Sequence, residues 1–87
     1  MFWVYVLYSL KDRRLYVGQT VNLEKRLALH NRGMVAATKF RRPLKLVHSE
    51  TYPTRREAME RESFLKSLWA SRFKKFLLAK LQKCGTM

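Results

Sequence analysis

Hydrophobic residues at the start of the chain fall into two short runs that are separated by a polar turn. Residues 2–8 are aromatic and β-branched, and residues 14–18 form the second run. Such residues favour strands. Strands joined by a turn as short as residues 11–13 pair in the antiparallel direction. The pattern therefore predicts a β-hairpin over residues 2–18.

Two helices are predicted next from their start and stop signals. Asn22 is a good N-cap and Gly33 a good C-terminal stop, which predicts a helix over residues 23–32. Thr54 is followed three residues later by Glu57, a capping box that opens the second helix.

The remaining segments are predicted from breaks in these patterns. Residues 36–43 are basic and irregular, and Pro43 precedes a third strand over residues 44–49. A last helix is expected over residues 71–83, where apolar residues recur at helical spacing: Phe73, Phe76, Leu77 and Leu81. This order of elements excludes an all-parallel fold. It predicts an α+β fold, with a small antiparallel sheet flanked by helices.

The composition predicts one basic domain, spanning residues 1–87, with a small core. Lys and Arg number 19 against 6 Asp and Glu, a net charge of +13, while 47% of the residues are hydrophobic. This hydrophobic content excludes a disordered chain. The charge favours a polyanionic partner, most commonly nucleic acid. Ribosomal association or an anionic membrane would also fit the charge.

A cytoplasmic protein is expected from the cysteine content. Cys84 is the single cysteine, so an intramolecular disulfide or a cysteine-based zinc site is excluded. The apolar segment from Phe2 to Leu10 is too short to span a bilayer and lacks the flanks of a signal peptide, so it is interpreted as a strand.

A carboxylate interrupts the apolar stripe of the second long helix. At about 100° of rotation per residue, Glu62 falls among Ala58, Leu65 and Trp69. A carboxylate there loses solvation unless a cation compensates it. The candidate partners are a metal ion, Arg26 and Lys66. An ordinary salt bridge at the rim of the core is the structural alternative.

Four further polar residues could act with Glu62. Arg26 and His30 are four positions apart and share a helix face, where Arg26 suits a phosphate group. Tyr5 and Tyr16 would meet across the hairpin, where one phenol could orient or deprotonate a water. Neighbouring positive charge would have to lower the pKa of that phenol. His30 is the alternative base, or a hydrogen-bond donor to the phosphate. The structural alternative for the two tyrosines is that their rings only pack in the protein. The structural alternative for Arg26 is a solvated position on the helix surface.

These residues lie in segments that resemble the GIY-YIG nuclease family between Trp3 and about Lys66. The matching segments are Trp3-Val4-Tyr5, Tyr16–Thr20, Asn22–Leu27, His30-Asn31 and Glu57–Glu62. Thr38, Arg41-Arg42-Pro43 and Leu46-Val47 are further matches to the small stand-alone bacterial branch. Trp3 replaces the first glycine of the family's name motif. Gln19 stands where the excision-repair branch carries a lysine, so a lysine-assisted mechanism does not transfer.

The resemblance implies a three-stranded antiparallel sheet and a single-metal phosphodiesterase site. Tyr5, Tyr16, Arg26, His30 and Glu62 would be catalytic, and Glu62 would bind Mg²⁺ or Mn²⁺. One carboxylate suffices for Mg²⁺ when water and substrate phosphate complete its coordination. We therefore expect a metal-dependent DNA endonuclease, which could serve in DNA repair or recombination.

The substrate and two competing functions stay open. Single-stranded, branched or damaged duplex DNA are candidate substrates, and RNA is not excluded. Lys39, Arg41 and Arg42 are the expected phosphate contacts, with Lys74 and Lys75 as the alternative. A non-catalytic nucleic-acid-binding module of the same fold is the main rival. A third interpretation takes Ser71 to Lys83 as a membrane or partner-protein helix.

Overall fold

The computed structural model describes residues 1–67 and 71–85, which fold into one antiparallel sheet with helices on both faces. Within the described residues the elements, in chain order, are β1 (Phe2–Ser9), β2 (Leu15–Thr20), α1 (Leu23–Asn31), β3 (Leu44–Tyr52), α2 (Arg55–Lys66) and α3 (Ser71–Gly85). The strand order is β2-β1-β3, and β1 pairs antiparallel with both neighbours. The predicted α+β fold with a three-stranded sheet is confirmed.

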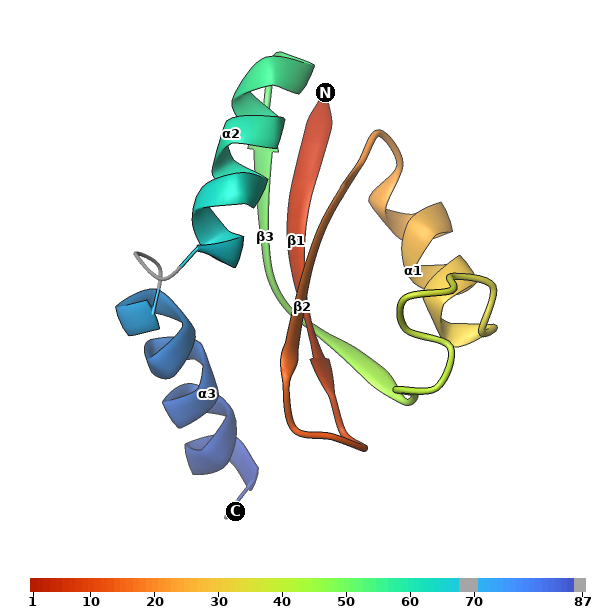
Figure 1. Ribbon diagram of the computed structural model, residues 1–87, viewed down its shortest axis with the longest axis vertical. Helices are drawn as coiled ribbons and strands as arrows, with labels where there is room; N and C mark the ends of the chain where they lie inside the picture. Colours follow the sequence, from red (N-terminus) through yellow and green to blue (C-terminus); the bar gives the residue numbers. More distant parts are fainter. Residues whose placement is uncertain (68–70, 86–87) are drawn as a thin grey trace.

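The sheet forms the middle of three layers (Figure 1). Helix α1 covers one face, and α2 and α3 lie on the other. Because alternate strand residues point to opposite faces, β1 supplies both cores. Val4 and Val6 pack with Ala58 and Leu65 under α2, whereas Tyr5 packs toward α1.

The helix boundaries follow the predicted signals. The side chain of Asn22 accepts a hydrogen bond from Lys25 N at 3.0 Å, and that of Thr54 accepts one from Glu57 N at 3.3 Å. Gly33 has a φ of 76°, a left-handed conformation that glycine adopts without strain. The two N-caps and the glycine stop are therefore confirmed. Of the capping box, the bond from Glu57 N to Thr54 is present, and the Glu57 carboxylate accepts from the Thr54 hydroxyl instead of the Thr54 backbone N–H.

Strand β3 runs three residues beyond its predicted end because polar side chains there find partners on the protein. The carboxylate of Glu50 accepts two hydrogen bonds from Arg61, at 2.8 and 3.0 Å, and one from Tyr52 at 2.5 Å. His48 Nε2 lies 2.7 Å from the same carboxylate. These bonds keep the end of β3 against α2, so the strand does not fray at Ser49.

Helix α3 contacts the sheet through part of its predicted apolar face. Leu77 is buried, and Phe73 packs edge-on against the His48 ring with the ring centroids 5.0 Å apart. Phe76 is 63% exposed, which differs from the predicted docking face. The side chain of Leu81 and all of Trp69 lie outside the described residues. In the described part of the chain, no helix has the length and apolar character needed to cross a membrane.

Candidate active site

A buried phenol organises the polar residues on the α1 face of the sheet. Tyr5 is 0% exposed, and its hydroxyl lies 2.8 Å from His30 Nε2. Arg26 Nε donates a hydrogen bond to the same hydroxyl at 3.4 Å. Since Arg26 and His30 are one turn apart on α1, both reach Tyr5 on the central strand. The prediction that they share a helix face is confirmed.

The second tyrosine completes the cluster from the edge strand. The Tyr16 ring centroid lies 6.5 Å from that of Tyr5 and 5.3 Å from that of His30. Tyr16 pairs with Leu7, so it sits diagonally from Tyr5 on the same face. The rings therefore meet across the hairpin as predicted. Tyr16 is only half-buried, whereas Tyr5 is enclosed.

Gly18 leaves room for the Tyr5 ring. It pairs directly with Tyr5 across β1 and β2. A Cβ atom at Gly18 would lie 2.5 Å from the Tyr5 hydroxyl oxygen and 2.6 Å from Cζ. Real Cβ atoms essentially never approach other heavy atoms so closely, so a side chain here would displace the phenol.

A buried threonine extends the cluster into the segment between α1 and β3. Thr38 is 0% exposed, and its hydroxyl lies 2.7 Å from His30 Nδ1. We call residues 32–43 the basic loop; Thr38 fixes this loop to the site. The residue patterns did not predict that Thr38 binds His30. The match of Thr38 to the bacterial branch was the one feature of the sequence that indicated a role for this residue.

The hydrogen-bond partners of His30 are consistent with a tautomer in which Nε2 accepts and Nδ1 donates. Burial, followed by the charge of Arg26, lowers the pKa of His30 from its ordinary 6.5 to about 4, so the ring is neutral at pH 7. Because the Tyr5 oxygen accepts from Arg26, its own hydrogen is free for His30 Nε2. Nδ1 then carries the ring hydrogen and donates to Thr38. His30 thus positions the Tyr5 hydroxyl.

The pKa of Tyr5 does not show the lowering that a water-activating phenol would need. Burial raises it above its ordinary 10.0, and this outweighs the lowering effect of the Arg26 hydrogen bond. The negative charge of Glu62 also contributes to the rise. The Tyr5 phenol is therefore protonated at neutral pH and donates a hydrogen bond.

Acid should destabilise the protein through His30, beginning below neutral pH. Since the folded-state pKa lies below the unfolded value, the unfolded chain binds the additional proton. Stability is then lost as the pH falls from 6.5 toward 4. The melting midpoint should drop over this window in the wild type and drop less in His30→Gln.

The matched control is His48→Gln, which removes the other of the two histidines. It should keep the wild-type loss of stability in acid. A wild-type melting midpoint that stays constant between pH 6.5 and 4 would contradict the expected role of His30.

Glu62 lies on α2, in the helix layer opposite the tyrosine cluster. Gln19 Nε2 donates to Glu62 Oε1 at 3.0 Å, and Lys66 Nζ lies 3.0 Å from Oε2. Lys66, one of the three predicted partners of Glu62, therefore contacts the carboxylate. Gln19 belongs to β2, the strand at the edge of the sheet. The site therefore spans this edge, with the tyrosine cluster on one face and the Glu62 carboxylate on the other.

The basic loop uses one of its predicted phosphate contacts internally. Arg41 Nε donates to Asp12 Oδ2 at 2.6 Å, which lowers the pKa of Asp12 to about 2. This pairing joins Arg41 to the hairpin turn, and its role as a phosphate contact stays a prediction. Lys39 is exposed. Arg42 is exposed too, and its guanidinium donates to Lys39 O at 3.1 Å and to Asn31 O at 3.4 Å, so within the described part of the chain it is bonded to backbone carbonyls but not to a carboxylate. They remain the predicted phosphate contacts of the loop.

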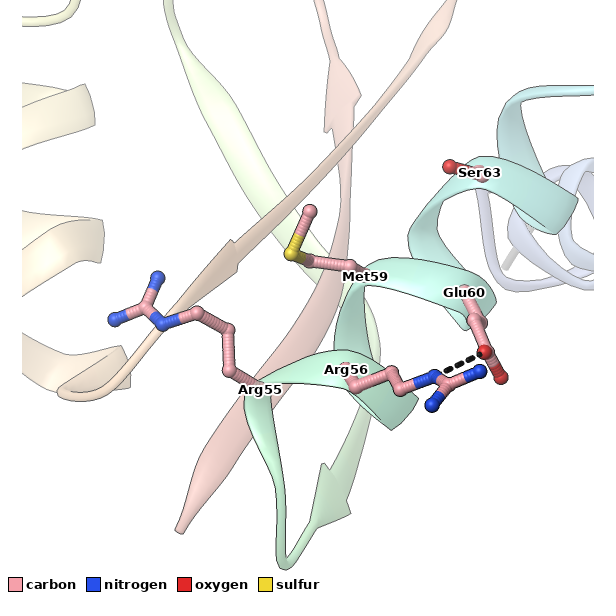
Figure 2. Close-up of a pocket in the computed structure, with 5 residues that line it drawn as sticks. All are labelled: Arg55, Arg56, Met59, Glu60 and Ser63. Atoms are coloured by element: carbon pink, nitrogen blue, oxygen red, sulfur yellow. Dashed lines mark hydrogen bonds and ion pairs between the residues drawn. The ribbon is translucent and has the colours of Figure 1, made fainter.

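An open hollow on the outer side of α2 lies away from the tyrosine cluster. It encloses about 630 Å³ and is lined by residues of α2 alone: Arg55, Arg56, Met59, Glu60 and Ser63. Figure 2 shows these side chains projecting from the helix, with Arg56 and Glu60 joined by an ion pair of 3.2 Å. None of the predicted catalytic residues lines it, so its size alone does not locate the active site.

Comparison with known proteins identifies the family. Residues 1–77 match the GIY-YIG catalytic domain. The chain belongs to the GIY-YIG family. A UPF0213 protein of Clostridium perfringens is 48% identical over 69 residues, covering 78% of this chain and 73% of that protein. A UPF0213 protein of Syntrophus aciditrophicus is 45% identical over 80 residues, covering 90% and 88%.

A solved structure supports the GIY-YIG fold. The solution structure of a UPF0213 protein from Bacillus halodurans superimposes with a TM-score of 0.52 at 36% sequence identity. The similarity covers 93% of this chain and 85% of that one. It therefore includes the sheet and the helices that carry the tyrosine cluster and Glu62.

GIY-YIG nucleases generally use divalent metal ions, and the donor set here fits a sparsely ligated ion. Among residues 1–67 and 71–85, no group of three or more His, Cys, Asp or Glu is placed to hold a metal. Glu62 offers one carboxylate, and its partner Lys66 is 54% exposed, so this partner can move aside. A Mg²⁺-type ion that keeps several waters suits such a site.

Proposed function

We propose that the protein is a divalent-metal-dependent endonuclease that hydrolyses phosphodiester bonds in DNA. The observation that carries the proposal is the hydrogen-bonded set of Arg26, Tyr5 and His30 beside Tyr16, with Glu62 across the edge strand. A module that only binds nucleic acid needs Lys and Arg on its surface. It has no need of a buried phenol held by an imidazole and a guanidinium.

Each residue has a distinct role in this proposal. Arg26 binds the oxygens of the scissile phosphate, where negative charge grows during attack. Tyr5 and His30 fix the orientation of Arg26 by hydrogen bonding. Tyr16, the more exposed phenol, orients the attacking water. Glu62 would hold Mg²⁺ or Mn²⁺, and the bound ion would supply positive charge for the phosphate and the departing oxygen.

The test of this function is a cleavage assay on labelled single-stranded, branched and damaged duplex DNA, with single-stranded RNA alongside. Mg²⁺ or Mn²⁺ should support cleavage of DNA, and EDTA should abolish it. Binding without cleavage of any of these substrates would overturn the proposal. The same assay identifies the substrate on which a role in repair or recombination depends.

A non-catalytic nucleic-acid-binding module is the second candidate. The contacts of Glu62 favour it, because one carboxylate oxygen is bound by Gln19 and the other by Lys66. In this alternative Glu62 is a structural residue at the rim of the core. It predicts salt-dependent DNA binding that is indifferent to divalent ions and to Glu62→Gln.

Phosphate contacts from the basic loop should appear in the salt dependence of binding. In a Glu62→Gln background, Arg42→Ala or Lys39→Ala should lower the slope of log affinity against log salt. The expected change is ~0.7 per lost contact on single strands and ~0.9 on duplex, because fewer counterions are released.

Arg41→Ala is the matched control for the salt titration. It removes the same charge from the same loop, but Arg41 is held by Asp12, so the slope should not change. Equal changes of the slope in Arg41→Ala and Arg42→Ala would count against the different roles of these two arginines. Unchanged slopes for Arg42→Ala and Lys39→Ala would place the contacts elsewhere, with Lys74 and Lys75 tested next.

A further inference from the structure

Two adjoining hollows lie beside the tyrosine cluster, where β2 leads into α1. The first encloses about 430 Å³ and is lined by Trp3, Val21, Asn22, Leu23, Glu24 and Leu27. The second encloses about 340 Å³ and is lined by Thr20, Val21, Asn22, Lys25, Arg26 and Leu29. Val21 and Asn22 line both, so the two hollows are neighbours.

The first hollow has the character of a site for a flat, largely apolar group. Trp3 is two residues before Tyr5 on β1, so both side chains point toward the α1 face. The Trp3 indole is half-buried and adjoins the aliphatic side chains of Leu23 and Leu27. Asn22 and Glu24 line the same hollow. Hollows of this size are sufficient for small ligands.

The second hollow has two cationic residues in its lining, Lys25 and Arg26. Arg26 also bonds the Tyr5 hydroxyl, which joins this hollow to the proposed catalytic cluster. A nucleotide combines an apolar planar base with a charged phosphate, and the two hollows offer matching surfaces in adjacent positions.

We propose that the hollow at Trp3 is a nucleobase subsite for single-stranded nucleic acid. An unstacked base packs against the Trp3 indole while a neighbouring phosphate lies at Lys25 and Arg26. Bases within a duplex are stacked on one another and cannot enter, so the subsite selects single strands. This inference rests on the proposed function, because Arg26 is the same residue that binds the scissile phosphate.

The test compares ligands with and without bases in a Glu62→Gln protein, which leaves them uncut. The ligands are an oligo-dT strand, a fully abasic strand of equal length and a duplex. Stacking of one base on an aromatic side chain should make oligo-dT bind at least ~5-fold more tightly than the abasic strand. Trp3→Ala should remove most of this preference, and Trp3→Phe should retain much of it.

Phe64→Ala is the matched control, because Phe64 is an aromatic residue that is 42% exposed on α2, on the other face of the sheet (Figure 1). It should leave the preference for oligo-dT intact. A measurement that keeps Trp3 in place uses Trp69→Phe, which makes Trp3 the single indole in the chain. Oligo-dT should quench its fluorescence, and the abasic strand should not.

The outcomes separate the subsite from the nuclease function. Equal affinity for oligo-dT and the abasic strand, or equal weakening of both by Trp3→Ala, would overturn the subsite. Failure to quench Trp3 fluorescence would do the same. Absence of metal-dependent cleavage by the wild type would overturn the nuclease function, yet a Trp3-dependent preference for bases would still establish the subsite.

Discussion

Glu62→Gln is expected to slow cleavage by ~100-fold or more, since a bound metal ion supplies several kcal/mol of transition-state stabilisation. Glutamine keeps the size of the side chain but lacks the negative charge that holds a divalent ion. The fold should persist, because the pair with Lys66 lies near the surface and such pairs contribute about 0–1 kcal/mol. Single-turnover cleavage rates and melting midpoints measure the two effects separately.

Glu60→Gln is the matched control for this loss. It makes the same chemical change on the same helix, but Glu60 is 66% exposed and pairs with Arg56 on the outer surface. Cleavage by Glu60→Gln should stay near the wild-type rate. Equal losses in the two variants, or a wild-type rate in Glu62→Gln, would show that Glu62 is not the metal ligand.

Gly18→Ala should both destabilise the protein and inactivate it. The new methyl group would overlap the Tyr5 hydroxyl, and the enclosed ring is already held by His30 and Arg26. Overpacking of a core typically costs about 1–3 kcal/mol. Displacement of the phenol would also break the hydrogen bond that Arg26 donates to the Tyr5 hydroxyl. Denaturant unfolding and cleavage rates measure the two consequences.

A double-mutant cycle with Tyr5→Leu tests whether the overlap is the cause. Leucine removes the atoms nearest to the added methyl group, so Gly18→Ala should cost less stability in the Tyr5→Leu protein than in the wild type. If the stability costs of the two substitutions are additive, the destabilisation by Gly18→Ala has a cause other than overlap with the Tyr5 ring. Wild-type stability of Gly18→Ala would mean that the Tyr5 ring can shift without loss.

Most of the fold follows from local signals that the sequence displays directly. Asn22, Thr54 and Gly33 act through bonds or dihedrals within a few residues, so their effects are readable without tertiary structure. The spacing of Arg26 and His30 likewise places both on one helix face. Antiparallel pairing of the first hairpin then brings Tyr5 and Tyr16 together.

Contacts that depend on long-range packing could not be predicted in the same way. The pairing of Arg41 with Asp12 joins the basic loop to a turn 29 residues away, and neither residue carries a local sign of it. The pKa of Tyr5 depends on the depth of its burial, which charge counting does not reveal. The position of Gln19 beside Glu62 depends on how α2 lies across the edge strand.

The central position of β1 affects when the sheet can form during synthesis of the chain. This strand is synthesised first, yet one of its neighbours, β3, ends only at Tyr52. Glu62 follows later still, on α2. A growing chain on the ribosome therefore carries the tyrosines and Arg26 well before it carries the proposed metal ligand. Competence to cut nucleic acid would arise only when synthesis of the domain is nearly complete.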